Sequence, residues 1–261
     1  MGLGVPPAAY DRATTIFSPE GDLYQVRYAF KAVEKGWTSL GARGKDSVII
    51  AAEKRLISVL LDIDDIEKIY RVDDHIGVAF AGMGSDGRIL ISQAQIIAVR
   101  HRLLYGELPS VDYIARTIAD IKQAYTQHAG VRPFGVSLIF AGVNPDGRVR
   151  LLKTDPGGQY FSYYAVAIGM GENYAVEVFK EEYKRDMGFE DLMKLVLKAL
   201  FKARIETAVS EEERDKEKLL SKFHEYVELG YAKSDTMRFE KMEKSEIKEY
   251  IDKYFDYISN V

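Results

Sequence analysis

The chain has 261 residues, with 36 lysines and arginines against 40 aspartates and glutamates and a formal net charge of −4. This balance lacks the basic excess that nucleic acids and anionic membrane surfaces select, so neither is an expected partner. At roughly 100 to 200 residues per domain, the length fits one large domain or two small ones. No internal repeat and no clean linker divide the chain, which favours one domain.

The absence of cysteine excludes disulfides, thiolate nucleophiles and cysteine-type zinc sites, and fits a soluble cytoplasmic protein. The longest uncharged stretch, residues 156–171, is interrupted by glycines and falls short of the ~20 apolar residues that a membrane-spanning helix needs. The first ten residues lack the features of a signal peptide. The scattered histidines have no metal-site spacing, so we expect neither a metal nor another cofactor.

The chain should begin with a polar, extended arm over residues 10–21, which ends in a turn at Ser18-Pro19-Glu20-Gly21. A helix is expected over residues 22–35, because apolar side chains recur there at helical spacing. These side chains are Leu23, Val26, Phe30 and Val33. The helix precedes any strand, so it is an addition in front of the core.

The rest of the chain alternates runs of strands with pairs of helices. The expected strands are 38–43, 47–53, 56–61, 76–81, 135–143, 148–153, 165–168, 226–233 and 237–241. The expected later helices are 88–104, 111–128, 172–185, 189–204 and 245–257. This order indicates antiparallel sheets layered with helices. The charge-rich segment 210–222 should be solvated.

Residues 82–87 match the pattern G-x-G-x-x-G between an expected strand and an expected helix. A dinucleotide site needs that helix to return into a parallel strand, but here it leads through Gly106 and Pro109 into another helix. The pattern therefore indicates a glycine-rich turn from strand to helix.

An acidic cluster precedes Lys68. Its members are Asp62, Asp64, Asp65 and Glu67. The cluster lacks the glycine and the distal glutamate of a calcium-binding loop, which favours a charged surface loop. Lys68 itself could remain exposed and anchor a carboxylate, or could simply be solvated.

A series of short motifs appears in order along residues 10–205. They are Tyr10-Asp11-Arg12, Phe17-Ser18-Pro19-Glu20-Gly21, Gln25-Val26-Arg27-Tyr28-Ala29, Lys35-Gly36, Ile66-Glu67-Lys68-Ile69, Tyr125-Thr126-Gln127, Val131-Arg132-Pro133-Phe134-Gly135-Val136-Ser137 and Ala167-Ile168-Gly169-Met170-Gly171. Together they closely resemble the α subunit of the 20S proteasome in its archaeal form. The resemblance implies the α+β fold of the Ntn hydrolases, a four-layer αββα sandwich of two antiparallel sheets with an extra N-terminal helix.

The resemblance also implies a domain organisation: a gating arm at residues 1–21, an α-specific helix at 22–36 and a proteasome-type αββα domain at 37–261. It implies a non-catalytic subunit of the outer heptameric ring. The implied partners are other α subunits, β subunits, an AAA ATPase activator that docks through its C-terminal tails, and unfolded polypeptide in transit.

Three groups of residues match functional positions of the family. The gate residues are Tyr10, Asp11, Arg12, Pro19 and Tyr28. The residues that dock the activator are Lys68, Gly21 and Arg27, where Lys68 lies between adjacent α subunits and pairs with the carboxylate of a tail. The residues of ring assembly are Leu23, Val26, Phe30 and Val33.

The main alternative is a catalytic β-type subunit, in which a threonine after a glycine becomes the N-terminal nucleophile. Here Trp37 follows Gly36, and an indole cannot attack a carbonyl. Thr38 and Ser39 come one and two residues late, although charged residues near the catalytic position are present. These are Glu53, Arg55 and Lys68. A threonine-type hydrolase with an unusual nucleophile, or an assembly chaperone or decoy, stays as an alternative.

Two charges depart from the family pattern. Asp22 stands where the family usually has Arg or Lys, and Arg27 stands where it has Glu. If the two residues are partners, reversing both charges preserves their attraction. These departures also leave open a diverged α paralogue in a mixed ring.

Overall fold

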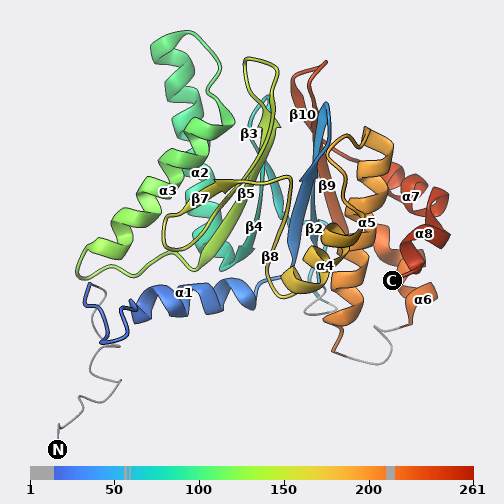
Figure 1. Ribbon diagram of the computed structural model, residues 1–261, viewed down its shortest axis with the longest axis horizontal. Helices are drawn as coiled ribbons and strands as arrows, with labels where there is room; N and C mark the ends of the chain where they lie inside the picture. The colour runs from blue at the N-terminus through green and yellow to red at the C-terminus, as the bar shows by residue number, and fades with distance from the viewer. Residues whose placement is uncertain (1–14, 56–57, 59, 210–214) are drawn as a thin grey trace, which may run out of the picture.

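The computed structural model describes residues 15–55, 58, 60–209 and 215–261. Two five-stranded sheets face each other, and helices cover their outer faces (Figure 1). The strand orders are β10-β9-β2-β1-β8 and β3-β4-β5-β6-β7, and neighbouring strands pair antiparallel. The expected four-layer αββα sandwich with an added N-terminal helix is therefore confirmed.

The first sheet contains β1 (Ser39–Arg43), β2 (Ser47–Glu53), β8 (Ala165–Ile168), β9 (Val227–Lys233) and β10 (Arg238–Lys241). The second contains β3 (Ile69–Asp73), β4 (Ile76–Gly82), β5 (Val136–Val143), β6 (Val149–Thr154) and β7 (Tyr160–Ser162). Strands β2 and β5 are buried along their whole length, because each lies between a helix layer and the other sheet.

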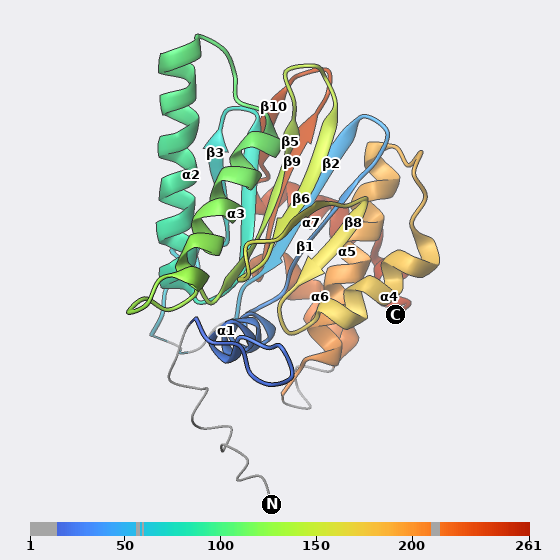
Figure 2. The ribbon, with the colours of Figure 1, turned by 60° about the vertical axis from the view of Figure 1, so that its left-hand side comes forward.

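The second sheet is covered by α2 (Gly84–Tyr105) and α3 (Val111–Gln127). The first is covered by α4 (Glu172–Glu182) and α5 (Phe189–Glu206). Around α5 lie α6 (Lys216–Lys222), the short 3₁₀ helix η3 (Phe223–Glu225), α7 (Lys244–Lys253) and α8 (Phe255–Ser259) (Figures 1 and 2).

The space between the sheets is filled by aliphatic side chains and by Phe239 of β10. The ring of Phe239 lies over two glycines of facing strands, Gly77 and Gly230. A Cβ atom on Gly77 would come within 2.1 Å of the phenyl Cζ. The glycines thus let the two sheets approach around a buried ring, whose full burial contributes about 1.5 to 3 kcal/mol.

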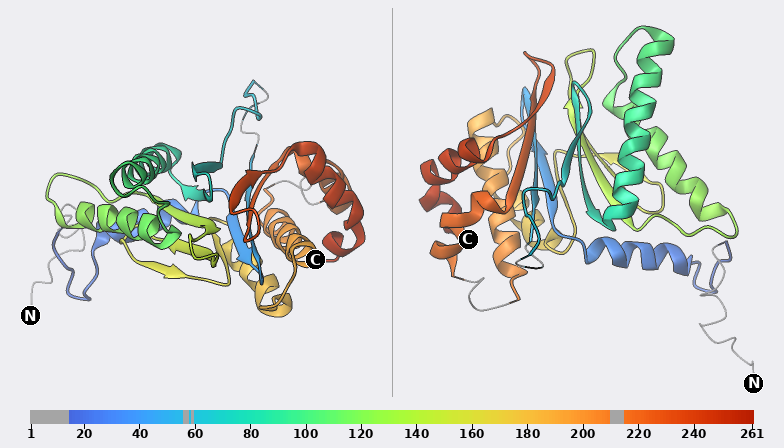
Figure 3. Two further views of the ribbon diagram at one scale, coloured as in Figure 1. Left: turned by 90° about the horizontal axis from the view of Figure 1, so that it is seen from above. Right: turned by 180° about the vertical axis from the view of Figure 1, so that it is seen from behind.

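The N-terminal helix α1 (Tyr24–Glu34) lies across one end of the sandwich and contacts β4 and β5 (Figures 2 and 3). Ala29 and Val33 are its buried residues. Directly after it, Gly36 approaches Gly82 so closely that a Cβ on Gly36 would lie 2.1 Å from the Gly82 nitrogen. A glycine is therefore required where α1 meets the end of β4.

Two expectations about local structure were wrong. The described residues of the expected strand 56–61 lie in a turn, with Leu60 93% exposed. The strand that precedes β4 in the chain is instead β3, which follows the acidic cluster and pairs with β4. In the charged segment 210–222, the described part forms α6, whose Leu219 and Leu220 are buried against the core.

Over the described part of the chain, no helix has the length and apolar character needed to cross a membrane.

Candidate functional site

A pocket of about 460 Å³ opens where the chain leaves α1, and we call it the Lys68 pocket. It lies among the segment after α1, the loop before β3, the strand β4 and the first turns of α2. Its lining residues are Lys35, Gly36, Trp37, Asp65, Ile66, Glu67, Lys68, Tyr70, Phe80, Gly82, Gly84 and Arg88. A larger hollow of about 670 Å³ lies by α4, α5, α7 and α8, and none of the site residues expected from the sequence lines it.

Lys68 is only 4% exposed, so the expectation of a solvated or fully exposed ammonium was wrong. Its Nζ donates to the carbonyl oxygen of Trp37 at 3.0 Å and lies 4.8 Å from the centre of the Phe80 ring. Among the described side chains, no carboxylate comes within ion-pair distance of this ammonium. Burial lowers the pKa of Lys68 to about 8, against the attraction of Glu53 and Glu228.

A buried polar cluster lies behind the pocket. The carboxylate of Glu53 accepts hydrogen bonds from the Thr38 amide and hydroxyl, both at 3.0 Å, and from Arg55 at 3.1 Å. The Thr38 hydroxyl also accepts from the Gly171 amide at 3.2 Å, and the Ser39 hydroxyl donates to a backbone carbonyl. Both hydroxyl groups that follow Trp37 are therefore buried and already hydrogen-bonded.

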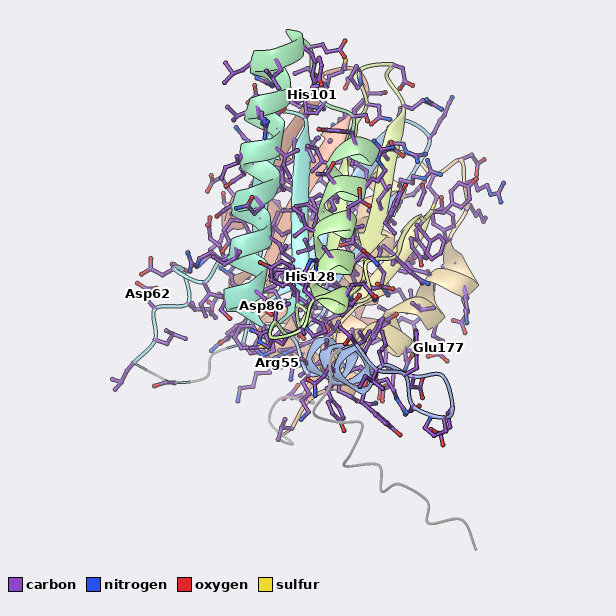
Figure 4. The ribbon with its side chains drawn as sticks, turned by 90° about the vertical axis from the view of Figure 1, so that its left-hand side faces the viewer. Arg55, Asp62, Asp86, His101, His128 and Glu177 are labelled. Carbon is purple, nitrogen blue, oxygen red and sulfur yellow. The ribbon has the colours of Figure 1, made fainter. Side chains whose placement is uncertain are left out.

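The acidic cluster forms the loop that leads to Lys68, with Asp62 on its outward-projecting part (Figure 4). Two of its members are paired with lysines, Asp64 with Lys244 and Glu67 with Lys241 at 2.9 Å. The hydrogen bond from Lys244 lowers the pKa of Asp64. Over the described residues, no group of three His, Asp or Glu side chains could hold a metal ion.

The G-x-G-x-x-G pattern forms the turn expected from the sequence. Strand β4 ends at Gly82, whose φ is +114°, and α2 begins at Gly84. Asp86 accepts from the Arg132 guanidinium at 2.6 and 2.8 Å and from the Gly135 amide at 2.9 Å. Its carboxylate thus joins the start of α2 to the segment before β5, as its position at the base of α2 indicates (Figure 4).

Of the expected gate residues, Tyr10, Asp11 and Arg12 lie outside the described residues. The turn before α1 closes with a hydrogen bond from the Gly21 amide to the Ser18 carbonyl at 2.9 Å, and Gly21 has a φ of +85°. Pro19 is exposed within this turn. Tyr28 is an exposed residue on α1 and stacks on Tyr24.

Asp22 and Arg27, the two reversed charges, form an ion pair of 2.8 Å within one subunit. Their side chains are 42% and 59% exposed, so the pair lies in water at the start of α1.

The residues expected in ring assembly divide into two groups. Val33 packs into the core between the sheets of its own subunit. Phe30 is exposed, and Leu23 and Val26 are half-buried.

Gly21 and Arg27 do not line the Lys68 pocket of their own subunit. Helix α1 has 11 residues and is therefore about 16 Å long, and it separates Gly21 from the pocket. The three residues expected to dock an activator can come together only if two subunits contribute.

The sequence interpretation missed the aromatic walls of the pocket, Trp37, Tyr70 and Phe80. One signal was present, since Trp37 is the single tryptophan of the chain and follows the glycine that ends α1. From the sequence, Trp37 was interpreted only as a replacement for the nucleophilic threonine of a catalytic subunit, and not as a wall of a pocket.

The comparisons with known proteins agree with this architecture. A model of the family of proteasome subunits matches residues 33–215, and the N-terminal signature of A-type proteasome subunits matches residues 10–32. The proteasome alpha subunit of Aeropyrum pernix is 59% identical over 254 residues, which cover 97% of this chain and 96% of the relative. The proteasome alpha subunit of Saccharolobus solfataricus is 48% identical over 253 residues, which cover 97% and 100%. The chain therefore belongs to the proteasome subunit family, as an archaeal-type α subunit of the 20S core.

Proposed function

We propose that the chain forms the heptameric, non-catalytic outer ring of a cytoplasmic 20S core particle, which admits unfolded polypeptide through a gate. We also propose that this ring docks an AAA ATPase activator through the activator's C-terminal tails. The observation that carries the docking proposal is Lys68, a buried ammonium at a solvent-open pocket with no paired carboxylate among the described side chains.

A C-terminal carboxylate fits the chemistry of this pocket. An ammonium has three donors, and the described contacts of Lys68 occupy one of them, with the Trp37 carbonyl. A buried charge is costly unless it is paired, so a carboxylate that reaches it gains strong, charge-assisted hydrogen bonds. The aromatic walls of Trp37, Tyr70 and Phe80 offer apolar surface to the tail's side chains. Gly21 and Arg27 would come from the neighbouring subunit.

A non-catalytic role follows from the residues after Gly36. Trp37 has no nucleophilic atom, and the hydroxyl groups of Thr38 and Ser39 are buried and hydrogen-bonded. Without cleavage of the chain before them, neither residue has a terminal amine of its own that could serve as its base. A threonine-type hydrolase is therefore the weaker candidate.

Gating is assigned to the arm that precedes the turn at residues 18–21. Pro19 and Gly21 favour one geometry of this turn and so set the direction in which the arm leaves α1. An arm with little apolar surface to bury can change between two positions of similar free energy. Tyr10, Asp11, Arg12 and Tyr28 are the residues we propose to hold the open position.

Two exposed apolar surfaces support assembly with other proteasome subunits. Tyr28 and Phe30 are exposed on α1, which fits a contact with a neighbouring ring member. Helix α2 exposes Ile89, Ile96, Val99 and Leu103, a stripe with the spacing of a helix-packing seam. A stripe of this kind is costly to leave in water, and we propose that a β subunit covers it.

The docking proposal is tested in barrels assembled from this chain and proteasome β subunits. The measurement is the hydrolysis rate of a fluorogenic peptide, with increasing amounts of a peptide that copies the ATPase C-terminus. Lys68→Ala should eliminate stimulation, and amidation of the tail peptide should do the same to the unmodified barrel. The matched control is Lys31→Ala, which removes an exposed lysine of α1 outside the pocket and should preserve stimulation. Stimulation that survives Lys68→Ala would contradict the proposal.

The gate has its own test. Removal of residues 2–12 should leave rings intact and speed the degradation of an unfolded protein, because the axial opening is no longer blocked. An unchanged rate would argue against a gate in this arm. The isolated chain should cleave no peptide, and a cleavage activity that disappears in Thr38→Ala would instead support the hydrolase.

A further inference from the structure

The loop of residues 62–68 forms one wall of the Lys68 pocket and is attached to the first sheet by a buried ion pair. We infer that Lys54 and Glu228, which form this pair, are positioning residues that hold Lys68 and its loop in the geometry that receives a tail carboxylate. The inference deepens the proposed docking function and rests on it. Neither residue lines the pocket, so they would act through the loop.

Glu228 fixes the backbone of Lys68. One carboxylate oxygen, Oε2, accepts from the Lys68 amide at 3.0 Å and from the Ile69 amide at 2.8 Å. The other oxygen, Oε1, lies 3.1 Å from the Nζ of Lys54. The carboxylate of β9 thus binds the two residues at which the loop becomes β3.

Lys54 fixes the middle of the same loop. Its ammonium is buried and donates to the carbonyl oxygens of Ile63 at 3.2 Å and Ile66 at 2.9 Å, besides its ion pair with Glu228. All three donors of the ammonium therefore have acceptors. Since Ile66 lines the pocket, Lys54 controls the position of a wall residue as well as that of the loop.

Glu228 also acts on the charge of Lys68. The carboxylates that attract the Lys68 ammonium are Glu53 on β2 and Glu228 on β9, and the rings of Phe80 and Trp37 lie over it. The other charged residues that line the pocket are Lys35, Asp65, Glu67 and Arg88. Burial lowers the pKa of Lys68, and the attraction of both carboxylates opposes this effect. Loss of the Glu228 charge should therefore lower that pKa further.

A second set of ion pairs reaches the same loop from outside. Lys241 pairs with Glu67 and Lys244 pairs with Asp64, but these side chains are largely exposed. Exposed pairs contribute little, because water screens them and both side chains lose freedom. Lys241 also lies 4.0 Å from Glu228, so the pair of Lys244 and Asp64 supplies the control that changes the same loop without touching its buried attachment.

The experiment compares variants in assembled barrels, each normalised to its own unstimulated rate. Glu228→Gln and Lys54→Met should each raise the tail-peptide concentration for half-maximal stimulation about tenfold or more. The double variant should lose less than the product of the two single losses, because either change alone already frees the loop. Lys244→Ala should stay within about twofold of the unmodified barrel, as should Lys198→Met, which breaks a mostly buried pair between α4 and α5.

A readout specific to positioning is the pH at which stimulation weakens. In Glu228→Gln this pH should fall, since the carboxylate that stabilises the Lys68 ammonium has gone. A merely destabilised subunit would lose assembly without moving that pH. If Lys54→Met forms no rings, Glu228→Asp decides, because it keeps the charge but withdraws the carboxylate by one methylene, and it should raise the half-maximal concentration severalfold.

The outcomes separate this inference from the proposed function. If Glu228→Gln and Glu228→Asp respond to the tail like the unmodified barrel while Lys68→Ala does not respond, the positioning role is wrong and docking at Lys68 stands. If Lys68→Ala responds normally, the docking function fails and this inference fails with it.

Discussion

Lys122 and Lys68 are both buried, and their surroundings differ. Lys122 of α3 is fully buried and donates to the Val136 carbonyl at 3.0 Å, the Thr154 carbonyl at 3.3 Å and the Thr154 hydroxyl at 2.9 Å. Lys68 has one such bond, and it faces a pocket. Burial lowers the pKa of both, to about 7 for Lys122 and to about 8 for Lys68. Burial and a shifted pKa therefore do not distinguish the two, whereas unused hydrogen-bonding capacity at an opening does.

The contacts of Lys122 explain why it is structural. Its ammonium joins α3 to the adjacent strands β5 and β6 through acceptors that are themselves buried. Asp155 attracts the ammonium and opposes the effect of burial on its pKa, without coming within ion-pair distance. No ligand is needed to complete this arrangement.

The largest expected effect comes from Lys122→Met and concerns stability against pH. The folded-state pKa of Lys122 lies near 7 and the ordinary value is 10.5, so between these values the unfolded chain binds more protons. Stability should then rise with pH above 7, by at most about 1.4 kcal/mol per pH unit. Lys122→Met should remove this rise and preserve stimulation by the tail peptide. The rise is measured from the melting temperatures of the unmodified and Lys122→Met rings at pH 6.5, 7.5 and 8.5.

Lys68→Met is the control that sharpens this comparison. It should remove only the part of the rise above pH 8, and it should abolish stimulation by the tail. If the melting temperature of Lys122→Met depends on pH as that of the unmodified ring does, burial does not lower the folded-state pKa of Lys122. The two buried lysines would then differ in pKa as well as in hydrogen bonding.

A smaller effect of pH is expected on the affinity of the unmodified barrel for the tail peptide. The tail carboxylate stays ionised at neutral and alkaline pH, so the charge of Lys68 decides the pairing. As the pH rises above about 8, the half-maximal tail concentration should increase by up to about tenfold per pH unit. Lys68→Arg supplies the control, because a guanidinium stays charged throughout this range. A constant half-maximal concentration between pH 7 and 9 in the unmodified barrel would contradict a Lys68–carboxylate pair.

The sequence predicted the order of the layers because apolar periodicity is strong in the long helices and the buried strands. It failed to predict β3, because Ile-Tyr-Arg-Val-Asp is a half-exposed edge strand with weak apolar character. A strand was predicted instead at the more apolar run of residues 56–61. The sequence also failed to predict the burial of Lys68, since the rings that cover it come from residues 37 and 80. Contacts between distant segments leave no local pattern.

The smallest expected effect concerns Asp22 and Arg27, a pair with both charges in water. The sequence suggested that these reversed charges are partners, and the 2.8 Å ion pair within one subunit supports that suggestion. An exposed pair of this kind contributes only about 0.2 to 1 kcal/mol to the free energy of unfolding. We expect this contribution to be smaller than the pH-dependent effects of Lys122 and Lys68. Asp22→Arg and Arg27→Glu should each lower the ring melting temperature slightly, and the double variant should recover most of the loss, because the exchanged charges attract again.

The salt dependence of the melting temperature tests whether this pair acts on ring stability through electrostatic attraction. At about 1 M salt the Debye length is only ~3 Å, close to the 2.8 Å between the two charged groups, so the difference between the single variants and the unmodified ring should shrink. The effects of Lys122→Met should persist at that salt concentration, because water and ions do not reach its ammonium. Additive losses in the double variant would show that the two charges are uncoupled despite their contact. Their reversal in this chain would then have to act on a neighbouring subunit, where Arg27 is proposed to contribute to the Lys68 pocket, and the tail response of Arg27→Glu would measure that contribution directly.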